Sequence, residues 1–366
     1  MTARLKICAV VGARPNFMKV APLAWAAKAR TDVELSIVHT GQHYDRNMSD
    51  LFFEELGIPE PVANLGVGGG SHAQQTAEVM VRFEKHVLEH RPDVVLVVGD
   101  VNSTIACAMV AAKLWIPVVH VEAGLRSFDK RMPEEINRLL TDVISDVLYV
   151  SEPSGAENLK KEGVPDDRVV FVGNVMIDTL LKSRDLASRS KILATLGVQE
   201  GRFALVTLHR PSNVDDPETL RGIWSALERV AKEIDIIFPV HPRTRARLTD
   251  QGLAAPAAIR LTDPVGYVDF LRLQSAAALI LTDSGGIQEE ATILAVPCLT
   301  LRENTERPVT IAVGCNKLVG TDPEKIVESA LAIVRGAVKK PTVPKYWDGR
   351  ASERILDDIV RRYRRV

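Results

Sequence analysis

Residues 94–122 read VVLVVGDVNSTIACAMVAAKLWIPVVHVE, and the order of apolar and polar residues in this stretch predicts the fold. Two short runs, VVLVV (94–98) and PVVHV (117–121), are apolar at nearly every position and rich in β-branched residues. Such runs are typical of strands buried on both faces of a parallel sheet, with helices connecting the strands. Asp100 follows the first run and Glu122 follows the second. The stretch therefore predicts a strand, a helix and a strand, with acidic residues at the carboxyl ends of both strands.

Similar runs, separated by helical patterns, recur in two series and predict two doubly wound α/β domains. A chain of 366 residues also fits two domains at roughly 150 residues each. The polar segment 180–197 contains no such run, so we place residues 1–180 in an N-terminal domain and 181–349 in a C-terminal domain. Residues 350–366 have helical spacing at their end and are expected to pack back on a domain surface. The other runs are LKICAVV (5–11), VELSIVH (33–39), VLYV (147–150), FALVTL (203–208), IDIIFPV (234–240), AAALILT (276–282) and PCLTL (297–301).

Composition narrows the classes of function. The apolar content of 46% and the charged content of 25% are typical of a soluble globular protein, and a net charge of −1 favours neither nucleic acid nor an anionic membrane as a partner. No apolar run approaches the ~18 residues that span a bilayer, and no secretory signal is recognisable, so we expect a cytoplasmic protein. The four cysteines lack metal-type spacing and are expected to be buried free thiols, with no metal ion bound. They are Cys8, Cys107, Cys298 and Cys315.

Polar residues at the strand ends are the candidates for chemistry, because ligands of parallel sheets bind beyond the carboxyl ends of the strands. His209, His241 and Asp283 follow three strands of the second series, as Asp100 and Glu122 follow two of the first. A helix N-cap is the alternative interpretation for Asp100 and Asp283. Histidine and glutamate are not typical caps, so the recurrence favours a binding or catalytic role.

The segment TDSGGIQEE (282–290) predicts a phosphate-binding site. Ser284, Gly285 and Gly286 would present a hydroxyl and backbone N–H groups to an anion at the start of the following helix. Glu290 lies further along that helix, where a carboxylate can accept from ribose hydroxyls. Arg302 and Arg307 follow the next strand and would complete a diphosphate clamp. The alternative interpretation for Gly285 and Gly286 is a tight turn, and the alternative for Arg302 and Arg307 is a solvated loop.

The turn GARPNFMK (12–19) gives a similar signal in the first domain. Arg14 and Lys19 would bring two cations to a helix N-terminus, where the helix dipole favours anions, so an anionic ligand between them is expected. The glycine-rich segment 66–70 follows no strand and lacks the dinucleotide spacing, so the sequence favours no nicotinamide cofactor, and Ser71 is expected to cap the next helix.

The connection 120–138, HVEAGLRSFDKRMPEEINR, adds both signs of charge after a buried strand. Asp100, Glu122 and Glu134 are expected to converge at one edge of the first domain, where close carboxylates shift each other's pKa values apart. Arg126 and Arg138 would offset their negative charge. The alternative interpretation for Glu134 is compensation of a helix dipole. The cluster predicts acid/base chemistry on a nucleotide diphosphate.

Seven motifs, in this order and over nearly the whole chain, resemble the non-hydrolysing UDP-N-acetylglucosamine 2-epimerase family. They are GARPNFMKVAPL (12–23), HTGQHYDRNMSD (39–50), VVGDVNST (97–104), HVEAGLRSFDKRMPEEINR (120–138), TLHR (207–210), TDSGGIQEEA (282–291) and LRENTERP (301–308). The resemblance implies two Rossmann-like domains of the glycosyltransferase B type, with the active site in the interdomain cleft and 350–366 returning to the first domain. It also implies a homodimer without a cofactor, and interconversion of UDP-GlcNAc and UDP-ManNAc through a 2-acetamidoglucal, which would supply surface polysaccharide.

The resemblance also implies roles for particular residues of this chain. Three carboxylates would provide acid/base catalysis, and the resemblance does not identify which of them is the base on each face of the sugar. A histidine would help to stabilise the leaving UDP. These are Asp100, Glu122, Glu134 and His209. The substrate-binding positions are Arg14, Lys19, Arg138, Ser284, Gly285, Gly286, Glu290 and Arg307. A second, regulatory UDP-GlcNAc would bind at Gln42, His43 and His241.

Other interpretations stay open beside this one. Ala13, Asn16 and Pro211 stand where many bacterial members of the family have other residues. The sequence of residues 126–133 also resembles that of relatives that act on UDP-2,3-diacetamido-2,3-dideoxy-glucuronic acid, so that sugar is the alternative substrate. A UDP-sugar glycosyltransferase needs at most one base, and a catalytically silent UDP-sugar sensor needs none. The three carboxylates count against both.

Overall fold

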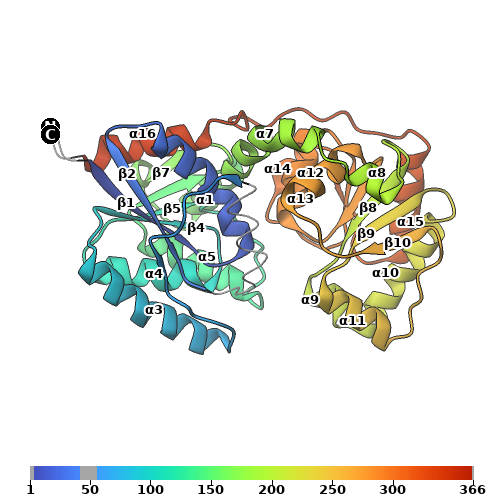
Figure 1. The fold of residues 1–366 in the computed structure, drawn as a ribbon, viewed down its shortest axis with the longest axis horizontal. Coiled ribbons are helices and arrows are strands. Elements are labelled where there is room, and N and C mark those ends of the chain that lie inside the picture. Colours follow the sequence, from blue (N-terminus) through green and yellow to red (C-terminus); the bar gives the residue numbers. More distant parts are fainter. Residues whose placement is uncertain (1–3, 42–55, 365–366) are drawn as a thin grey trace. The chain divides into compact units, whose positions relative to one another are not determined.

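The computed structural model describes residues 4–41 and 56–364, apart from the side chain of Arg14. The chain divides into two compact units, Met1–Lys182 with Lys345–Val366 and Ser183–Pro344. Each unit consists of one parallel sheet and the helices that connect its strands (Figure 1). No helix in these two described ranges is long and apolar enough to cross a membrane.

The first unit contains a seven-stranded parallel sheet in the order β3-β2-β1-β4-β5-β6-β7. Connections run to one side from β1 and to the other side from β4, so the switch point lies between these two strands. The strands are β1 (Leu5–Val11), β2 (Val33–His39), β3 (Ala63–Asn64), β4 (Val94–Val98), β5 (Val118–Val121), β6 (Val147–Val150) and β7 (Val169–Phe171). The helices are α1 (Arg14–Lys28), α3 (His72–Glu89), α4 (Asn102–Lys113), α5 (Pro133–Ile144), α6 (Pro153–Lys161), η1 (Asp166–Arg168), α16 (Ala351–Tyr363) and α7 (Val175–Ser188), which continues past Lys182 into the second unit.

The second unit repeats this plan with six parallel strands in the order β10-β9-β8-β11-β12-β13, and its switch point lies between β8 and β11. The strands are β8 (Phe203–Thr207), β9 (Asp235–Pro239), β10 (Ile259–Thr262), β11 (Leu279–Thr282), β12 (Cys298–Thr300) and β13 (Asn316–Leu318). The helices are α8 (Ile192–Leu196), α9 (Pro211–Val214), α10 (Pro217–Val230), α11 (Pro242–Asp250), α12 (Tyr267–Ala276), α13 (Gly285–Leu294), α14 (Pro308–Ala312) and α15 (Pro323–Val334).

The predicted strands form the interiors of both sheets. All five residues of β4 are buried, as expected for a run without polar residues between two helical layers. Each of the nine predicted runs contains a strand of the structure. The four edge strands, β3, β7, β10 and β13, were not predicted. The expectation of buried free thiols is confirmed for all four cysteines, and Ser71 caps α3 as predicted.

The end of the chain packs on the first unit through α16. Asp178 of α7 accepts hydrogen bonds from the backbone N–H groups of Ala351 (3.1 Å) and Ser352 (2.7 Å) and therefore caps α16 from outside it. The Tyr149 hydroxyl donates to Asp358 (3.0 Å), and the Trp347 indole donates to the Ser151 carbonyl (2.9 Å). These buried hydrogen bonds join residues 347–358 to the end of strand β6 and to helix α7.

We predict that Gly173→Ala destabilises the protein where the end of the chain packs. Gly173 has φ = 89°, and an added Cβ would clash with the Tyr346 carbonyl. Strain and clash together should lower the free energy of unfolding by roughly 2–5 kcal/mol. Gly163→Ala is the matched control, because Gly163 has φ = 84° and open space around it, so only about 1 kcal/mol is expected. Equal melting temperatures for the two variants would contradict the prediction.

Candidate active site

Asn16 closes the turn between β1 and α1 at the switch point of the first unit. Its side-chain oxygen accepts hydrogen bonds from the N–H groups of Gly12 (3.2 Å) and Ala13 (2.9 Å). Its side-chain N–H group donates to the Val98 carbonyl at the end of β4 (3.1 Å). One buried amide thus joins the two strands that flank the switch point. The sequence marked Asn16 only as a departure from the family pattern.

Lys19 and Glu122 form a buried ion pair at the same edge of the sheet. Lys19 Nζ also lies beside Gly99, where an added Cβ would be 2.8 Å away. Glu122 has φ = 71°, a left-handed conformation that costs a non-glycine residue about 1–3 kcal/mol. The structure therefore places a cation against this carboxylate and holds the carboxylate in a strained turn, which is typical of functional sites.

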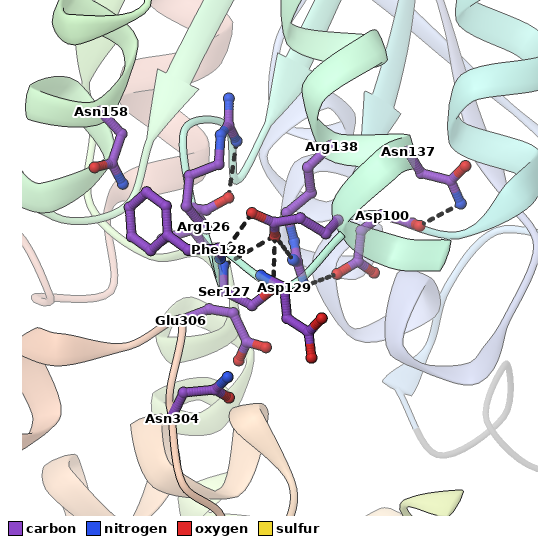
Figure 2. A network of polar contacts seen from close by, with 12 residues as sticks. Asp100, Arg126, Ser127, Phe128, Asp129, Asn137, Arg138, Asn158, Asn304 and Glu306 are labelled. Atoms are coloured by element: carbon purple, nitrogen blue, oxygen red, sulfur yellow. Dashed lines mark hydrogen bonds and ion pairs between the residues drawn. The ribbon is translucent and has the colours of Figure 1, made fainter. Parts of the chain in front are cut away.

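Asp100 follows β4 and is paired with Arg138 of α5. Arg138 donates to the Asp100 carboxylate at 2.7 Å, and Asn137 donates to the Asp100 carbonyl at 2.9 Å (Figure 2). The Arg138 side chain is buried, whereas a quarter of the Asp100 side chain is exposed. Arg138 thus offsets the charge of Asp100, as the sequence analysis suggested, and the carboxylate still reaches solvent.

Glu135, rather than Glu134, orders the connection between β5 and α5. The buried Glu135 carboxylate accepts hydrogen bonds from Ser127 N–H (2.9 Å) and Phe128 N–H (3.0 Å) and pairs with Arg138 (2.6 Å). Glu134 is half-buried in the first turn of α5 and makes no hydrogen bond or ion pair with the described residues. Among the described residues, its carboxylate therefore has no partner that would hold it in place.

Arg126 does not offset the charge of the candidate catalytic carboxylates, so that expectation was wrong. Its guanidinium donates to Asp142 of α5 (2.7 Å) and to Glu162 after α6 (2.7 Å). Burial opposes the charge of Arg126, but these two carboxylates raise its pKa further above the ordinary value. Arg126 is therefore an anchor of the loop and not a group of the site.

His209 and Asp283 form a pair at the switch point of the second unit. Asp283, fully buried after β11, accepts from the His209 ring nitrogen Nδ1 (2.9 Å) and from the N–H groups of His209 (3.0 Å) and Arg210 (2.9 Å). Burial raises the pKa of Asp283, but these donors lower it below the ordinary value. About half of the His209 side chain (49%) is exposed, so a ligand can reach this side chain.

The N-cap interpretation does not hold for Asp100 or Asp283. Val101 and Ser284 occupy the N-cap positions of α4 and α13, and neither helix has a side-chain cap. Ser284, Gly285 and Gly286 are partly exposed at the start of α13. With N–H groups not bonded within the helix and a serine hydroxyl, this end of α13 is suited to binding phosphate oxygens.

Both arginines of the predicted clamp are buried and already paired within the second unit. Arg302 makes two hydrogen bonds to the Glu306 carboxylate, at 3.0 and 2.7 Å. Arg307 pairs with Glu289 of α13. The solvated-loop alternative is therefore wrong for both residues.

Glu290 is buried in α13 with a donor on each oxygen. Tyr267 donates to one oxygen at 3.0 Å and Gln274 to the other at 2.7 Å. Burial raises the pKa of Glu290 to about 7, and the two hydrogen bonds only partly oppose this effect. No pattern in the sequence indicates that Tyr267 and Gln274 contact this carboxylate.

The remaining predicted residues lie outside the described side chains or apart from these clusters. Gln42 and His43 fall outside the described residues, and so does the side chain of Arg14. His241 is exposed at the N-cap of α11, where its Nδ1 accepts from the Arg243 N–H (3.2 Å). Within residues 4–41 and 56–364, no group of three or more His, Cys, Asp and Glu side chains is arranged to bind a metal ion.

Two doubly wound units, one with paired carboxylates at its switch point and one with a phosphate-type helix N-terminus beside buried arginines, define a nucleotide-sugar enzyme of the α/β class. The comparisons with known proteins agree. Residues 26–360 match the family model of UDP-N-acetylglucosamine 2-epimerase. The chain belongs to this family and is an enzyme of it, and its two-domain fold is of the glycosyltransferase B type.

Individual relatives have two different substrates in their names. The UDP-N-acetylglucosamine 2-epimerase of Methanocaldococcus jannaschii is 42% identical over 96% of this chain and 98% of its own length. The UDP-2,3-diacetamido-2,3-dideoxy-D-glucuronate 2-epimerase of Pseudomonas aeruginosa is also 42% identical, over 98% of this chain and 100% of its own. A crystal structure of the Methanocaldococcus enzyme in complex with UDP-GlcNAc and UDP has a TM-score of 0.90 and covers 98% of this chain and 100% of that one.

We predict that Glu290 makes stability depend on pH between about 4.5 and 7. Its pKa is about 7 in the folded protein against 4.5 for an ordinary glutamate, so the folded state binds the proton more tightly. The associated stability is fully present below pH 4.5 and is lost, by about 3 kcal/mol, as the pH rises through 7. Glu290→Gln removes this loss. Melting temperatures of wild type and variant should diverge from pH 5 to 8, and parallel curves would contradict the prediction.

Proposed function

We propose that the protein interconverts UDP-GlcNAc and UDP-ManNAc, and so supplies an activated sugar for surface polysaccharide. The observation that carries the proposal is a pair of carboxylates after the neighbouring strands β4 and β5, each with its own buried cation. The relative from Methanocaldococcus, named for this reaction, supports the choice of sugar. The phosphate-type N-terminus of α13 supports a diphosphate leaving group.

The chemistry has to remove a proton that is not acidic. Carbon C2 of the sugar has no neighbouring ketone, so direct deprotonation is slow. In the proposed reaction a base takes the C2 proton while the C1–O bond breaks, and the electron pair of the C–H bond forms the C1=C2 double bond of a 2-acetamidoglucal. UDP departs with the electrons of the C1–O bond. Protonation of C2 on the opposite face and return of UDP to C1 give the epimer.

Each group of residues has a role in this scheme. Asp100, Glu122 and Glu134 act as acid and base on the two faces of the sugar, with contributions of ~10²–10⁴-fold each being typical. The charge on the departing UDP is stabilised by cations and by N–H groups that are already in place. We assign that task to Arg14, Lys19, His209, Ser284, Gly285, Gly286 and Arg307, a further substrate contact to Arg138, and the ribose contact to Glu290.

A second substrate has support of its own. The relative from Pseudomonas aeruginosa is as similar in sequence as the one from Methanocaldococcus and is named for UDP-2,3-diacetamido-2,3-dideoxy-D-glucuronate. The elimination and re-addition are the same for this sugar, because C2 carries an acetamido group in both. The glycosyltransferase and sensor alternatives lack such support, since neither uses several carboxylates.

The test is a proton NMR time course with UDP-GlcNAc in D₂O. We expect the manno anomeric signal to appear with deuterium at C2, because the abstracted proton exchanges with solvent. Asp100→Asn should slow this conversion by at least about 100-fold without weakening UDP binding in calorimetry. No conversion of UDP-GlcNAc, together with conversion of the diacetamido uronate, would select the second substrate. No conversion of either sugar would contradict the proposal.

We propose that two copies of the chain associate through the outer face of α5. Ile136, Leu140 and Val143 are 46%, 48% and 69% exposed and share one side of the helix, at positions i, i+4 and i+7. The buried side of the same helix is polar instead. An isologous interface would cover this apolar stripe with the identical stripe of a second copy.

Sedimentation should therefore show a particle of twice the 40.2 kDa chain mass. Replacing Leu140 and Val143 by Asp together should give single chains, because two charges would be buried without partners. Val62→Asp is the matched control: Val62 is similarly exposed (64%) but lies before β3, so this variant should stay dimeric. A monomeric wild type would exclude the interface.

A further inference from the structure

Asp142 is a buried carboxylate on the inner side of α5 that neither the comparisons nor the sequence motifs assign. One of its oxygens lies 2.6 Å from His120 Nδ1. The other accepts from the Gly124 N–H (3.0 Å) and from the Arg126 guanidinium (2.7 Å). Burial raises the pKa of Asp142, but His120 and Arg126 lower it below the ordinary value. Asp142 thus contacts three separate points of the connection that leaves β5.

His120 continues these contacts to the neighbouring strand end. Its Nε2 lies 2.8 Å from the Gly99 carbonyl, and the ring is fully buried. A backbone carbonyl only accepts, so Nε2 donates to Gly99, while Nδ1 faces the Asp142 carboxylate. Gly99 directly precedes Asp100. Asp142 therefore contacts, through His120, the peptide that directly precedes Asp100, a candidate catalytic residue.

Glu122 lies between the two residues that Asp142 holds. His120 precedes it by two positions and Gly124 follows it by two. The turn is strained at Glu122, which has φ = 71°, whereas Gly124, with φ = 77°, adopts the left-handed conformation without strain. The turn is also close-packed, because a side chain at position 124 would clash with the Gly155 carbonyl. Such a conformation persists only where surrounding contacts fix it, and Asp142 supplies contacts on both sides of Glu122.

We propose that Asp142 is a positioning residue for catalysis: through His120 and Gly124 it sets the Glu122 turn, and through His120 and Gly99 it orients Asp100. The inference rests on the proposed function, because it takes Asp100 and Glu122 as the acid and base. Asp142 acts only through these residues and belongs to the first unit, whereas the predicted diphosphate contacts of α13 belong to the second. Loss of Asp142 should therefore slow the chemical step much more than it weakens UDP binding.

The experiment compares Asp142→Asn with Asp178→Asn. Both carboxylates are buried in the first unit and accept three hydrogen bonds or ion pairs from its backbone and side chains, but Asp178 caps α16. We expect both variants to melt at lower temperatures. Asp142→Asn should lower kcat by roughly 10- to 100-fold with KM within about threefold of wild type. Asp178→Asn should keep the wild-type kcat.

A crystal structure of Asp142→Asn separates this inference from the proposed function. We expect the φ angle of Glu122 to leave the left-handed region in this variant and to stay there in Asp178→Asn. If wild type converts neither sugar, the proposed function fails, and the Glu122 angle alone decides the positioning role. A wild-type kcat in Asp142→Asn, or an unchanged Glu122 turn, overturns the inference. If Asp142→Asn does not fold, His120→Gln, which keeps one donor for Gly99, is subject to the same criteria.

Discussion

The pairing of buried charges along the inner side of α5 is the constraint on which the first unit depends. A buried charge without a partner is strongly destabilising, so each ionised group on this face has to meet its counterpart in one geometry. Arg138 meets Asp100 and Glu135, and Asp142 meets His120 and Arg126. These pairs fix the helix against the ends of β4 and β5. The apolar residues of α5 lie on the outer side as a consequence, which inverts the usual arrangement of a surface helix.

The interior of each sheet could be predicted from the sequence, whereas the edges could not. A strand between two others in a parallel sheet is covered by helices on both faces, so a run such as VVLVV has almost no other place to fold. An edge strand has one hydrogen-bonded neighbour and less cover, so polar residues are tolerated, as in NKL of β13 and IRLT of β10. The pairing of these edge strands depends on residues that are distant in the chain. The local pattern of apolar and polar residues carries no information about such contacts.

For the candidate site too, one part could be predicted from the sequence and another part could not. The positions of Asp100, Glu122, His209 and Ser284 after their strands follow from the alternation of strands and helices. The partners of these residues do not follow, because Asn16 reaches Val98 and Asp142 reaches His120 across contacts that only the folded chain creates. Arg126 shows most clearly that proximity in the sequence does not predict which side chains pair. Its proximity in sequence to Glu122 suggested a shared cluster, but its guanidinium lies on the Asp142 side of the loop.

In both units the cations of the candidate site are already paired with carboxylates. Lys19 pairs with Glu122 and Arg307 with Glu289, so neither arrives at a ligand as an uncompensated charge. In the proposed function, a diphosphate in the ground state would share these cations with protein carboxylates, which limits how much of the interaction contributes to binding substrate. In the proposed reaction, negative charge grows on the UDP oxygens as the C1–O bond breaks, and the same cations would attract these oxygens more strongly. Interactions that strengthen only in the transition state raise the rate, so internal pairing of this kind is suited to the proposed release and return of UDP.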